Sequence, residues 1–124
     1  MRFSALVIVA LATGALASGG ALASDKEAGE KVFKSKCGSC HTVEAGKNRT
    51  GPSLHGISGR KAAQVGGFKY SDDMKGSGIT WSDDKLQAYL EDPKKVVPKG
   101  SMVFAGLKKQ DERDNVIAFL KSKN

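Results

Sequence analysis

The sequence predicts an all-α fold in which a few helices are joined by long loops. Three stretches of the 124-residue chain carry apolar residues at helical spacing, and each begins with residues that commonly cap a helix. The segments between them are rich in glycine and other turn formers, and no β-hairpin pattern stands out. Long loops in a small domain usually have a function or are held in place by a bound group.

The first 23 residues predict a cleaved secretory signal peptide. Arg2 supplies the positive charge, residues 3–17 are almost all apolar, and small residues before Ala23 form a cleavage site. The apolar run is shorter than the roughly 20 residues of a membrane-spanning helix. We therefore expect a soluble, exported, periplasmic protein without a membrane span, in which residues 24–124 form a single domain.

The first predicted helix covers about residues 24–36. It opens with Ser24-x-x-Glu27, the pattern of a capping box. Phe33 lies on its apolar face, and Gly29 one turn earlier would allow another helix to approach closely.

The middle of the chain is predicted to be mostly loop. Residues 46–67 contain many turn formers, and Ser71 can cap a short helical turn that ends near Gly76. A clearer helix opens at residues 82–84, and Asp92-Pro93 ends it because the residue before a proline disfavours helix.

The end of the chain repeats this pattern of a loop followed by a helix. Residues 96–106 form a second predicted loop, which contains Met102. The last helix begins near Asp111, and Val116, Ile117 and Leu120 form its apolar stripe.

Cys37-Gly38-Ser39-Cys40-His41 is the pattern that attaches a c-type haem. Both thiols can add to one porphyrin, and the histidine that follows can then bind the iron. A Cys-x-x-Cys pair is also used for zinc and for thiol–disulfide exchange. Zinc would need about two more ligands, whereas these are the only two cysteines and a single further histidine remains. The pattern therefore favours haem.

Three side chains of the predicted mature chain could bind the other side of the iron: His55, Met74 and Met102. A methionine is more often a core filler than a ligand. Met102 lies in a loop that contains proline and glycine, where packing explains it less well, so it is the favoured candidate. Met74 reads as filler or surface, and His55 as a loop histidine.

The formal net charge is +7, and one of the positive charges, Arg2, lies in the predicted leader. Acidic proteins, nucleic acids and anionic membranes can all attract such a surface. No nucleic-acid-binding motif accompanies the basic residues, so we expect no nucleic-acid binding. Asn48-Arg49-Thr50 matches a glycosylation sequon, which we interpret as accidental in a periplasmic protein.

Further motifs follow the pentapeptide in a fixed order along the chain. They are Thr50-Gly51-Pro52-x-Leu54-His55-Gly56, Gly59-Arg60-Lys61, Gly67-Phe68-x-Tyr70-Ser71-Asp72, Gly78-Ile79-Thr80-Trp81, Tyr89-Leu90-x-Asp92-Pro93-Lys94-Lys95 and Met102-x-Phe104-Ala105-Gly106. With these motifs, residues 28–121 resemble class I cytochromes c of mitochondrial length, the group that includes bacterial cytochromes c2.

The resemblance implies the cytochrome c fold, with three main helices, short helical turns and long loops wrapped around one covalent haem c. It implies attachment through Cys37 and Cys40, with His41 and Met102 as the axial ligands of the iron. The Pro52 carbonyl would accept a hydrogen bond from His41. The other cofactor-binding roles that it implies fall on Arg60, Tyr70 and Trp81 at a haem propionate, Tyr89 at the methionine sulfur, and Phe104 beside the haem.

The function implied is one-electron transport, without enzymatic activity. We expect a monomer that binds acidic surfaces of membrane complexes transiently, between a cytochrome bc1-type donor and a terminal oxidase or photosynthetic reaction centre. The residues expected to ring the haem edge are Lys31, Lys36, Arg49, Lys94, Lys95, Lys99, Lys108 and Lys109. A haem peroxidase or small-ligand binder, and an acceptor dedicated to one dehydrogenase, are the alternatives.

Three positions depart from the pattern of the family. Gly100 stands where a threonine usually precedes the methionine ligand by two residues, and Met74 stands where many relatives have an asparagine. Both departures leave open the strength of the Met102 bond and the reduction potential. Phe119 replaces a usual tyrosine, which keeps the packing and loses only a hydroxyl.

Overall fold

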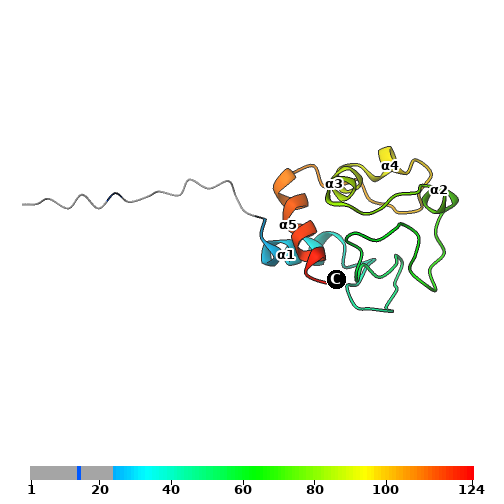
Figure 1. The fold of residues 1–124 in the computed structure, drawn as a ribbon, viewed down its shortest axis with the longest axis horizontal. Helices are drawn as coiled ribbons and strands as arrows, with labels where there is room; N and C mark the ends of the chain where they lie inside the picture. The colour runs from blue at the N-terminus through cyan, green and yellow to red at the C-terminus, as the bar shows by residue number, and fades with distance from the viewer. Residues whose placement is uncertain (1–13, 15–23) are drawn as a thin grey trace, which may run out of the picture.

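Helices joined by long loops make up the structure, a computed structural model that describes Gly14 and residues 24–124 (Figure 1). The helices are α1 (Lys26–Lys36), α2 (Asp72–Lys75), α3 (Asp83–Glu91), α4 (Pro93–Val96) and α5 (Gln110–Lys121). Within the described ranges the only β pairing is an isolated bridge between Lys61 and Thr80. The prediction of an all-α fold is confirmed. Apart from Gly14, the predicted leader lies outside the described residues.

The crossing of α1 and α5 brings two helix backbones very close together. A Cβ atom on Gly29 would lie 1.9 Å from the backbone oxygen of Asn115, so only glycine allows this approach. One turn further along α1, the rings of Phe33 and Phe119 pack with their centroids 5.4 Å apart. The terminal helices therefore lock the two ends of the domain together, as Gly29 predicted.

Helix α1 begins one residue later than the capping box predicted. Asp25, rather than Ser24, caps it, because its carboxylate accepts hydrogen bonds from the backbone N–H groups of Glu27 (2.8 Å) and Ala28 (3.3 Å). The N–H of Asp25 in turn donates to Oδ1 of Asn115 on α5 (2.8 Å). The contact between the terminal helices therefore decides which of two adjacent capping residues is used.

The short helix α4 was not predicted. Asp92 ends α3 as expected, but Pro93 then occupies the first position of a new helical turn, where its missing N–H costs nothing. The predicted caps of the two helices before it are confirmed, since Ser71 Oγ accepts from the N–H of Met74 (3.2 Å) and Ser82 Oγ from that of Lys85 (3.4 Å). Helix α5 begins at Gln110, next to the predicted Asp111.

Two clusters of buried side chains form the core. One gathers under α3 around Trp81 and Leu86, and the other lies between α1 and α5 around Phe33 and Val116. Ile57 and Leu90 pack against both. Among the described residues no helix has the length and hydropathy needed to cross a bilayer.

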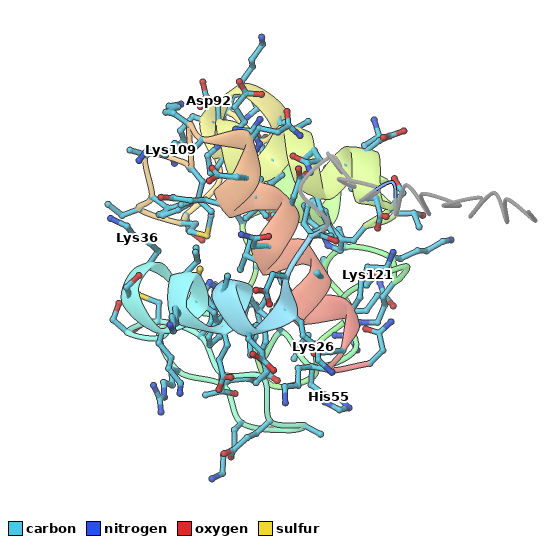
Figure 2. All side chains as sticks on the ribbon, turned by 90° about the vertical axis from the view of Figure 1, so that its left-hand side faces the viewer. Lys26, Lys36, His55, Asp92, Lys109 and Lys121 are labelled. Atoms are coloured by element: carbon cyan, nitrogen blue, oxygen red, sulfur yellow. The ribbon has the colours of Figure 1, made fainter. Side chains whose placement is uncertain are left out.

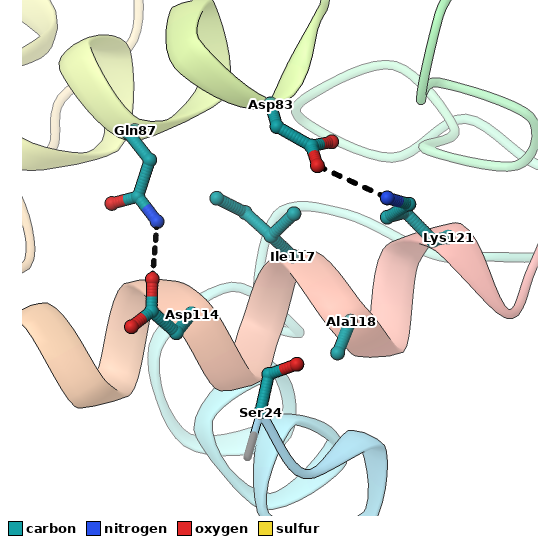
Figure 3. A pocket seen from close by; sticks show the side chains of 7 residues that line it. All are labelled: Ser24, Asp83, Gln87, Asp114, Ile117, Ala118 and Lys121. Carbon is teal, nitrogen blue, oxygen red and sulfur yellow. Dashed lines mark hydrogen bonds and ion pairs between the residues drawn. The ribbon is translucent and has the colours of Figure 1, made fainter. Parts of the chain in front are cut away.

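A polar groove between α3 and α5 is separate from the main cavity (Figure 3). Its charged groups already have partners, since Lys121 Nζ lies 3.0 Å from Asp83 Oδ2 and Gln87 donates to Asp114. It shares no lining residue with the main cavity. The groove therefore stabilises the packing of the two helices and offers little to a ligand.

Candidate functional site

A mostly apolar cavity of about 300 Å³ brings together residues from nearly the whole described chain. It lies between the loops that follow α1, the segment around α2, helix α3 and the loop before α5. All ten predicted site residues line it: Cys37, Cys40, His41, Pro52, Arg60, Tyr70, Trp81, Tyr89, Met102 and Phe104.

His41 is held in a fixed orientation on one wall. Its Nδ1 lies 2.8 Å from the carbonyl oxygen of Pro52, which accepts the ring N–H and leaves Nε2 free as a ligand. Burial lowers the pKa of His41, and the hydrogen bond to Pro52 opposes this. A Cβ atom on Gly51 would lie 2.4 Å from Cε1 of the ring, so glycine is needed there to make room for the imidazole.

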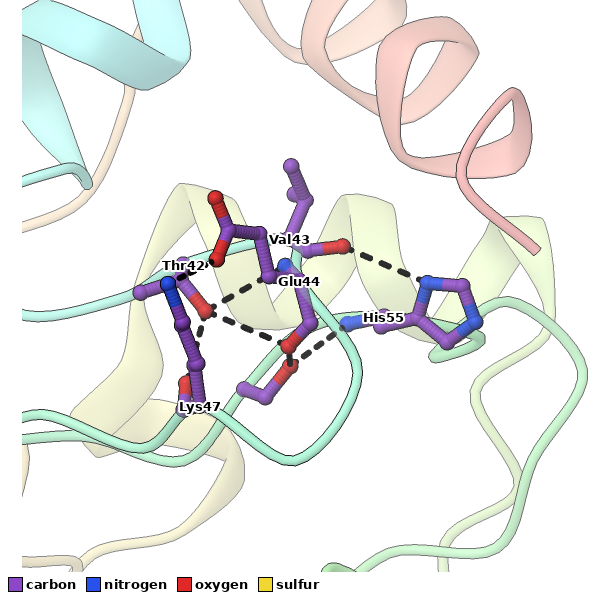
Figure 4. Close-up of polar contacts among 6 residues, drawn as sticks. Thr42, Val43, Glu44, Lys47 and His55 are labelled. Atoms are coloured by element: carbon purple, nitrogen blue, oxygen red, sulfur yellow. Dashed lines mark hydrogen bonds and ion pairs between the residues drawn. The ribbon is translucent and has the colours of Figure 1, made fainter.

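A hydrogen-bond network fixes the loop that carries the Pro52 carbonyl (Figure 4). The hydroxyl of Thr42 donates to the carbonyl of Lys47 (2.6 Å), and that of Ser53 donates to the carbonyl of Glu44 (2.6 Å). An exposed ion pair of 2.7 Å between Lys47 and Glu44 closes the turn and lowers the pKa of Glu44. These bonds position the loop on which the orientation of His41 depends.

Met102 and Tyr89 also line the cavity, and they contact each other. The Tyr89 hydroxyl donates a long hydrogen bond, 4.0 Å, to the sulfur of Met102. The Tyr89 ring also packs against Trp81, with centroids 4.9 Å apart. Burial raises the pKa of Tyr89 to about 12, so its hydroxyl stays protonated and remains a donor at neutral pH.

The two thiols line the cavity and are not joined by a disulfide. Burial, with a smaller effect of Cys40, raises the pKa of the Cys37 thiol to about 11, the opposite of the lowered pKa of a thiol–disulfide exchange site. Within residues 24–124, no cluster of three or more His, Cys, Asp or Glu side chains could hold a metal ion.

Comparison with known proteins identifies the family of this chain. The sequence profile of the cytochrome c family, described as "Cytochrome c", matches residues 26–124. The chain belongs to the cytochrome c family. It is 50% identical over 98 residues to cytochrome c of Gibberella zeae, covering 78% of this chain and 92% of the relative. It is 55% identical over 86 residues to cytochrome c2 iso-2 of Magnetospirillum molischianum, covering 69% of this chain and 89% of that protein.

The fold agrees with a solved member of the family. Cytochrome cH from Methylobacterium extorquens superposes with a TM-score of 0.75 at 44% identity, covering 80% of this chain and 99% of the other. As a cytochrome c, this protein is an electron carrier and not an enzyme. The Cys37-x-x-Cys40-His41 motif, with Met102 on the same cavity, is consistent with one covalently bound haem c.

The polar end of the cavity fits the carboxylates of a cytochrome c haem. Arg60 lines the cavity, and its buried Nε has no hydrogen-bond partner in the described part of the chain. The oxygen of Tyr70 accepts the N–H of Val65 (3.1 Å), which leaves the hydroxyl proton free to donate. An unpaired buried guanidinium donor is costly, so an acceptor supplied by the bound group would satisfy it.

Two further residues shape the cavity, and the sequence indicated only one of them. Met74, interpreted as filler or surface, lines the cavity and packs against the cluster around Trp81, which agrees with a filler role. Gly51 was noted only as part of a motif, although its position between a loop and an imidazole requires glycine. For Met74, the sequence held one signal, its departure from the asparagine of many relatives.

Two other sequence features have structural roles. His55 does not line the cavity, and its Nδ1 lies 3.2 Å from the carbonyl oxygen of Val43 (Figure 4). Asn48 is half-buried, and its side chain donates to the carbonyl of Gly66 (3.0 Å) and accepts the N–H of Ser53 (2.9 Å). Its amide is thus engaged within the fold, which agrees with an accidental sequon.

Proposed function

We propose that this cytochrome c is a soluble, monomeric, periplasmic carrier of single electrons between membrane complexes. Its donor is a cytochrome bc1-type complex, and its acceptor is a terminal oxidase or a photosynthetic reaction centre. The observation that carries the proposal is the cavity on which Cys37, Cys40, His41 and Met102 meet. His41 and Met102 both line this cavity, and together they offer the pair of ligands suited to an iron that changes its charge without changing its ligands.

Each side chain has a defined task in this proposal. Cys37 and Cys40 attach the haem c, which supplies a one-electron ferric–ferrous couple. His41 and Met102 are the axial ligands, and the Pro52 carbonyl holds the imidazole in one tautomer. Thioether ligation favours the ferrous state, and the apolar wall beside it disfavours the additional charge of the ferric state.

The other cofactor-binding residues orient and shield the group. Arg60, Tyr70 and Trp81 donate to a haem propionate, which would give the orphaned Arg60 Nε its partner. Tyr89 donates to the Met102 sulfur. Phe104, half-buried at the edge of the cavity, excludes water from it.

The charged surface supports transient docking on acidic partners. The eight cations expected around the haem edge are all exposed, and none forms an ion pair within the described residues. The lysines that do form ion pairs are Lys34, Lys47 and Lys121. Unpaired cations steer a carrier toward acidic surfaces and release it quickly, with a strong dependence on salt.

The spectrum of the ferric holoprotein tests the ligand pair. We expect a methionine–iron charge-transfer band and negligible binding of cyanide at neutral pH. Met102→Leu should abolish the band and open the iron to cyanide, whereas Met74→Leu should leave the band in place. A band that survives in Met102→Leu would contradict the assignment of Met102.

Kinetics test the partners. Stopped-flow oxidation and reduction with purified bc1-type complex, oxidase and reaction centre should give fast bimolecular rates that fall with ionic strength. Fast, saturable reduction by one periplasmic dehydrogenase alone would instead identify a dedicated acceptor.

Export is tested by sequencing the N-terminus of the periplasmic protein, which should begin at Ser24. Light scattering tests whether the protein is a monomer.

A further inference from the structure

The loop that carries Met102 has few bonds of its own. Backbone hydrogen bonds hold its ends, from Gly100 N–H to the Val97 carbonyl (3.0 Å) and from Leu107 N–H to the Leu90 carbonyl (2.7 Å). Between them, residues 101–106 make no backbone–backbone hydrogen bond within the described chain. Val103 is 100% exposed. Such a segment opens easily unless side chains from elsewhere hold it.

The short helix α2 supplies one such side-chain contact, from outside the cavity. Oδ2 of Asp73 accepts the backbone N–H of Lys99 at 2.8 Å, across 26 positions of sequence. Lys99 is the residue just before Gly100, where the loop begins. Asp73 is placed for this bond by the Ser71 cap, which fixes the start of the helix. At the same end of the loop, Lys94 Nζ donates to the carbonyl of Gly100.

Met74, the next residue of α2, faces the cavity. Met74 lines the cavity and packs, together with Tyr89, against the cluster around Trp81. Successive residues on a helix point about 100° apart, so one turn can present Asp73 to the loop and Met74 to the cavity. An apolar thioether here leaves the Tyr89 hydroxyl with the Met102 sulfur as its one hydrogen-bond partner in the described chain.

We propose that α2 is a clasp that positions the Met102 loop, with Asp73 fastening the entry of the loop from outside and Met74 filling the wall beside Tyr89 from inside. Both are positioning residues that act through Met102, and the inference rests on the proposed ligation of the iron by Met102. The clasp compensates for a loop in which Gly100 has no side chain to anchor it. It keeps the sulfur in place and keeps water away from that wall.

The outer half of the clasp is tested on the ferric holoprotein with Asp73→Ala. Imidazole binds the iron only when Met102 leaves, so its binding rate reports opening of the loop. Loss of one hydrogen bond should raise this rate about three- to tenfold. Asp72→Ala, in the same helical turn, removes an identical charge without touching the loop and should leave the rate unchanged.

Asp73→Asn separates the bond from the charge. Its amide oxygen can still accept the Lys99 N–H, so we expect a rate close to that of the unmutated protein. Equal rates in Asp73→Ala and Asp72→Ala would overturn the outer half of the clasp. A rate in Asp73→Asn as high as in Asp73→Ala would overturn the hydrogen bond as its cause.

The inner half is tested with Met74→Leu and Met74→Ala. Leucine keeps the apolar volume and should preserve both the imidazole rate and the reduction potential. Alanine opens a gap beside Tyr89, so we expect faster imidazole binding and a lower potential as water enters. An unchanged potential and rate in Met74→Ala, with denaturant titration showing an intact fold, would overturn this half.

Amide hydrogen exchange at Leu107 tests whether α2 holds the loop, independently of whether Met102 binds the iron. Leu107 lies at the far end of the loop from Asp73, so its exchange should accelerate in Asp73→Ala and not in Asp72→Ala. If the unmutated ferric protein lacks the methionine–iron band, the ligation proposal fails. The Leu107 comparison then still decides whether α2 holds the loop, and unchanged exchange in both variants would refute the clasp.

Discussion

At the scale of single residues, the site depends on small groups that leave room for larger ones. Gly51 is the clearest case, because any side chain there would meet the His41 ring. The Pro52 carbonyl, the next group along, accepts the His41 N–H. One loop therefore sets both the space around the imidazole and its tautomer.

Gly51→Ala should displace the His41 ring and lengthen its bond to the Pro52 carbonyl. Overpacking of this kind costs about 1–3 kcal/mol, so we expect a loss of that size in a urea titration of the holoprotein. Gly66→Ala is the matched control, since nothing lies within 4 Å of its added Cβ and its φ is not positive. Equal stabilities of the two variants would show that the loop adapts without cost.

Tyr89→Phe should lower the reduction potential. The Tyr89 hydroxyl donates to the Met102 sulfur at 4.0 Å and draws electron density from it, which favours the ferrous state. A weak hydrogen bond is worth about 1 kcal/mol or less, which corresponds to at most about 40 mV for one electron. Redox titration measures the shift, and a potential that rises or stays constant would contradict the role of the hydroxyl.

At the scale of helices, the packing of α1 on α5 closes the domain. Gly29→Ala would place a Cβ 1.9 Å from the Asn115 carbonyl oxygen, which belongs to the backbone and cannot rotate away. The helices must separate, at a cost of about 3 kcal/mol. Denaturant titration should show this loss, while Gly66→Ala should stay within about 0.5 kcal/mol of the unmutated protein. A similar stability of both variants would mean that the crossing is not tight.

The helices could be predicted from the sequence wherever local signals were enough. Ser71 and Ser82 cap the helices that they were expected to cap, and the stripe around Val116 is buried as expected. The start of α1 could not be predicted, because Ser24 and Asp25 are both good caps. Asn115, 90 positions away, selects between them.

The site shows the same division between local and distant causes. Motif order placed all ten predicted residues on one cavity. For Met74 the sequence left filler and surface open, because its neighbours Asp73 and Lys75 are polar, and the structure favours filler. Its direction is set by Tyr89 and Trp81, which no local pattern connects to it. Likewise Pro93 signals the end of one helix and equally the start of another, so α4 depended on the tertiary fold.

At the scale of the whole molecule, the core is divided around the cavity. The two buried clusters are small, and a domain of about 100 residues buries only a modest core. Cys37→Ser together with Cys40→Ser removes covalent attachment of the haem. We expect this variant to lose cooperative unfolding and much of its helical circular dichroism. A sharp unfolding transition at the temperature of the holoprotein would show that the cavity walls support themselves.

The charge pattern of the whole surface gives the last prediction. Lys36 and Lys26 are exposed cations at opposite ends of α1, and Figure 2 shows Lys36 and Lys109 at the left edge of the view, with Lys26 lower and nearer its centre. Of these three lysines only Lys36 lines the cavity, and because it is exposed it lies at the rim. If the protein docks through that rim, Lys36→Gln should slow electron transfer to an acidic membrane complex more than Lys26→Gln does.

Removing one charge near an acidic partner weakens the attraction by about 0.5 kcal/mol in water, which slows the bimolecular rate about twofold. The difference between the two variants should appear at low ionic strength in stopped-flow measurements. It should vanish near 1 M salt, where the screening length falls to about 3 Å. Equal slowing by both substitutions would mean that net charge, rather than the rim of the cavity, guides the encounter.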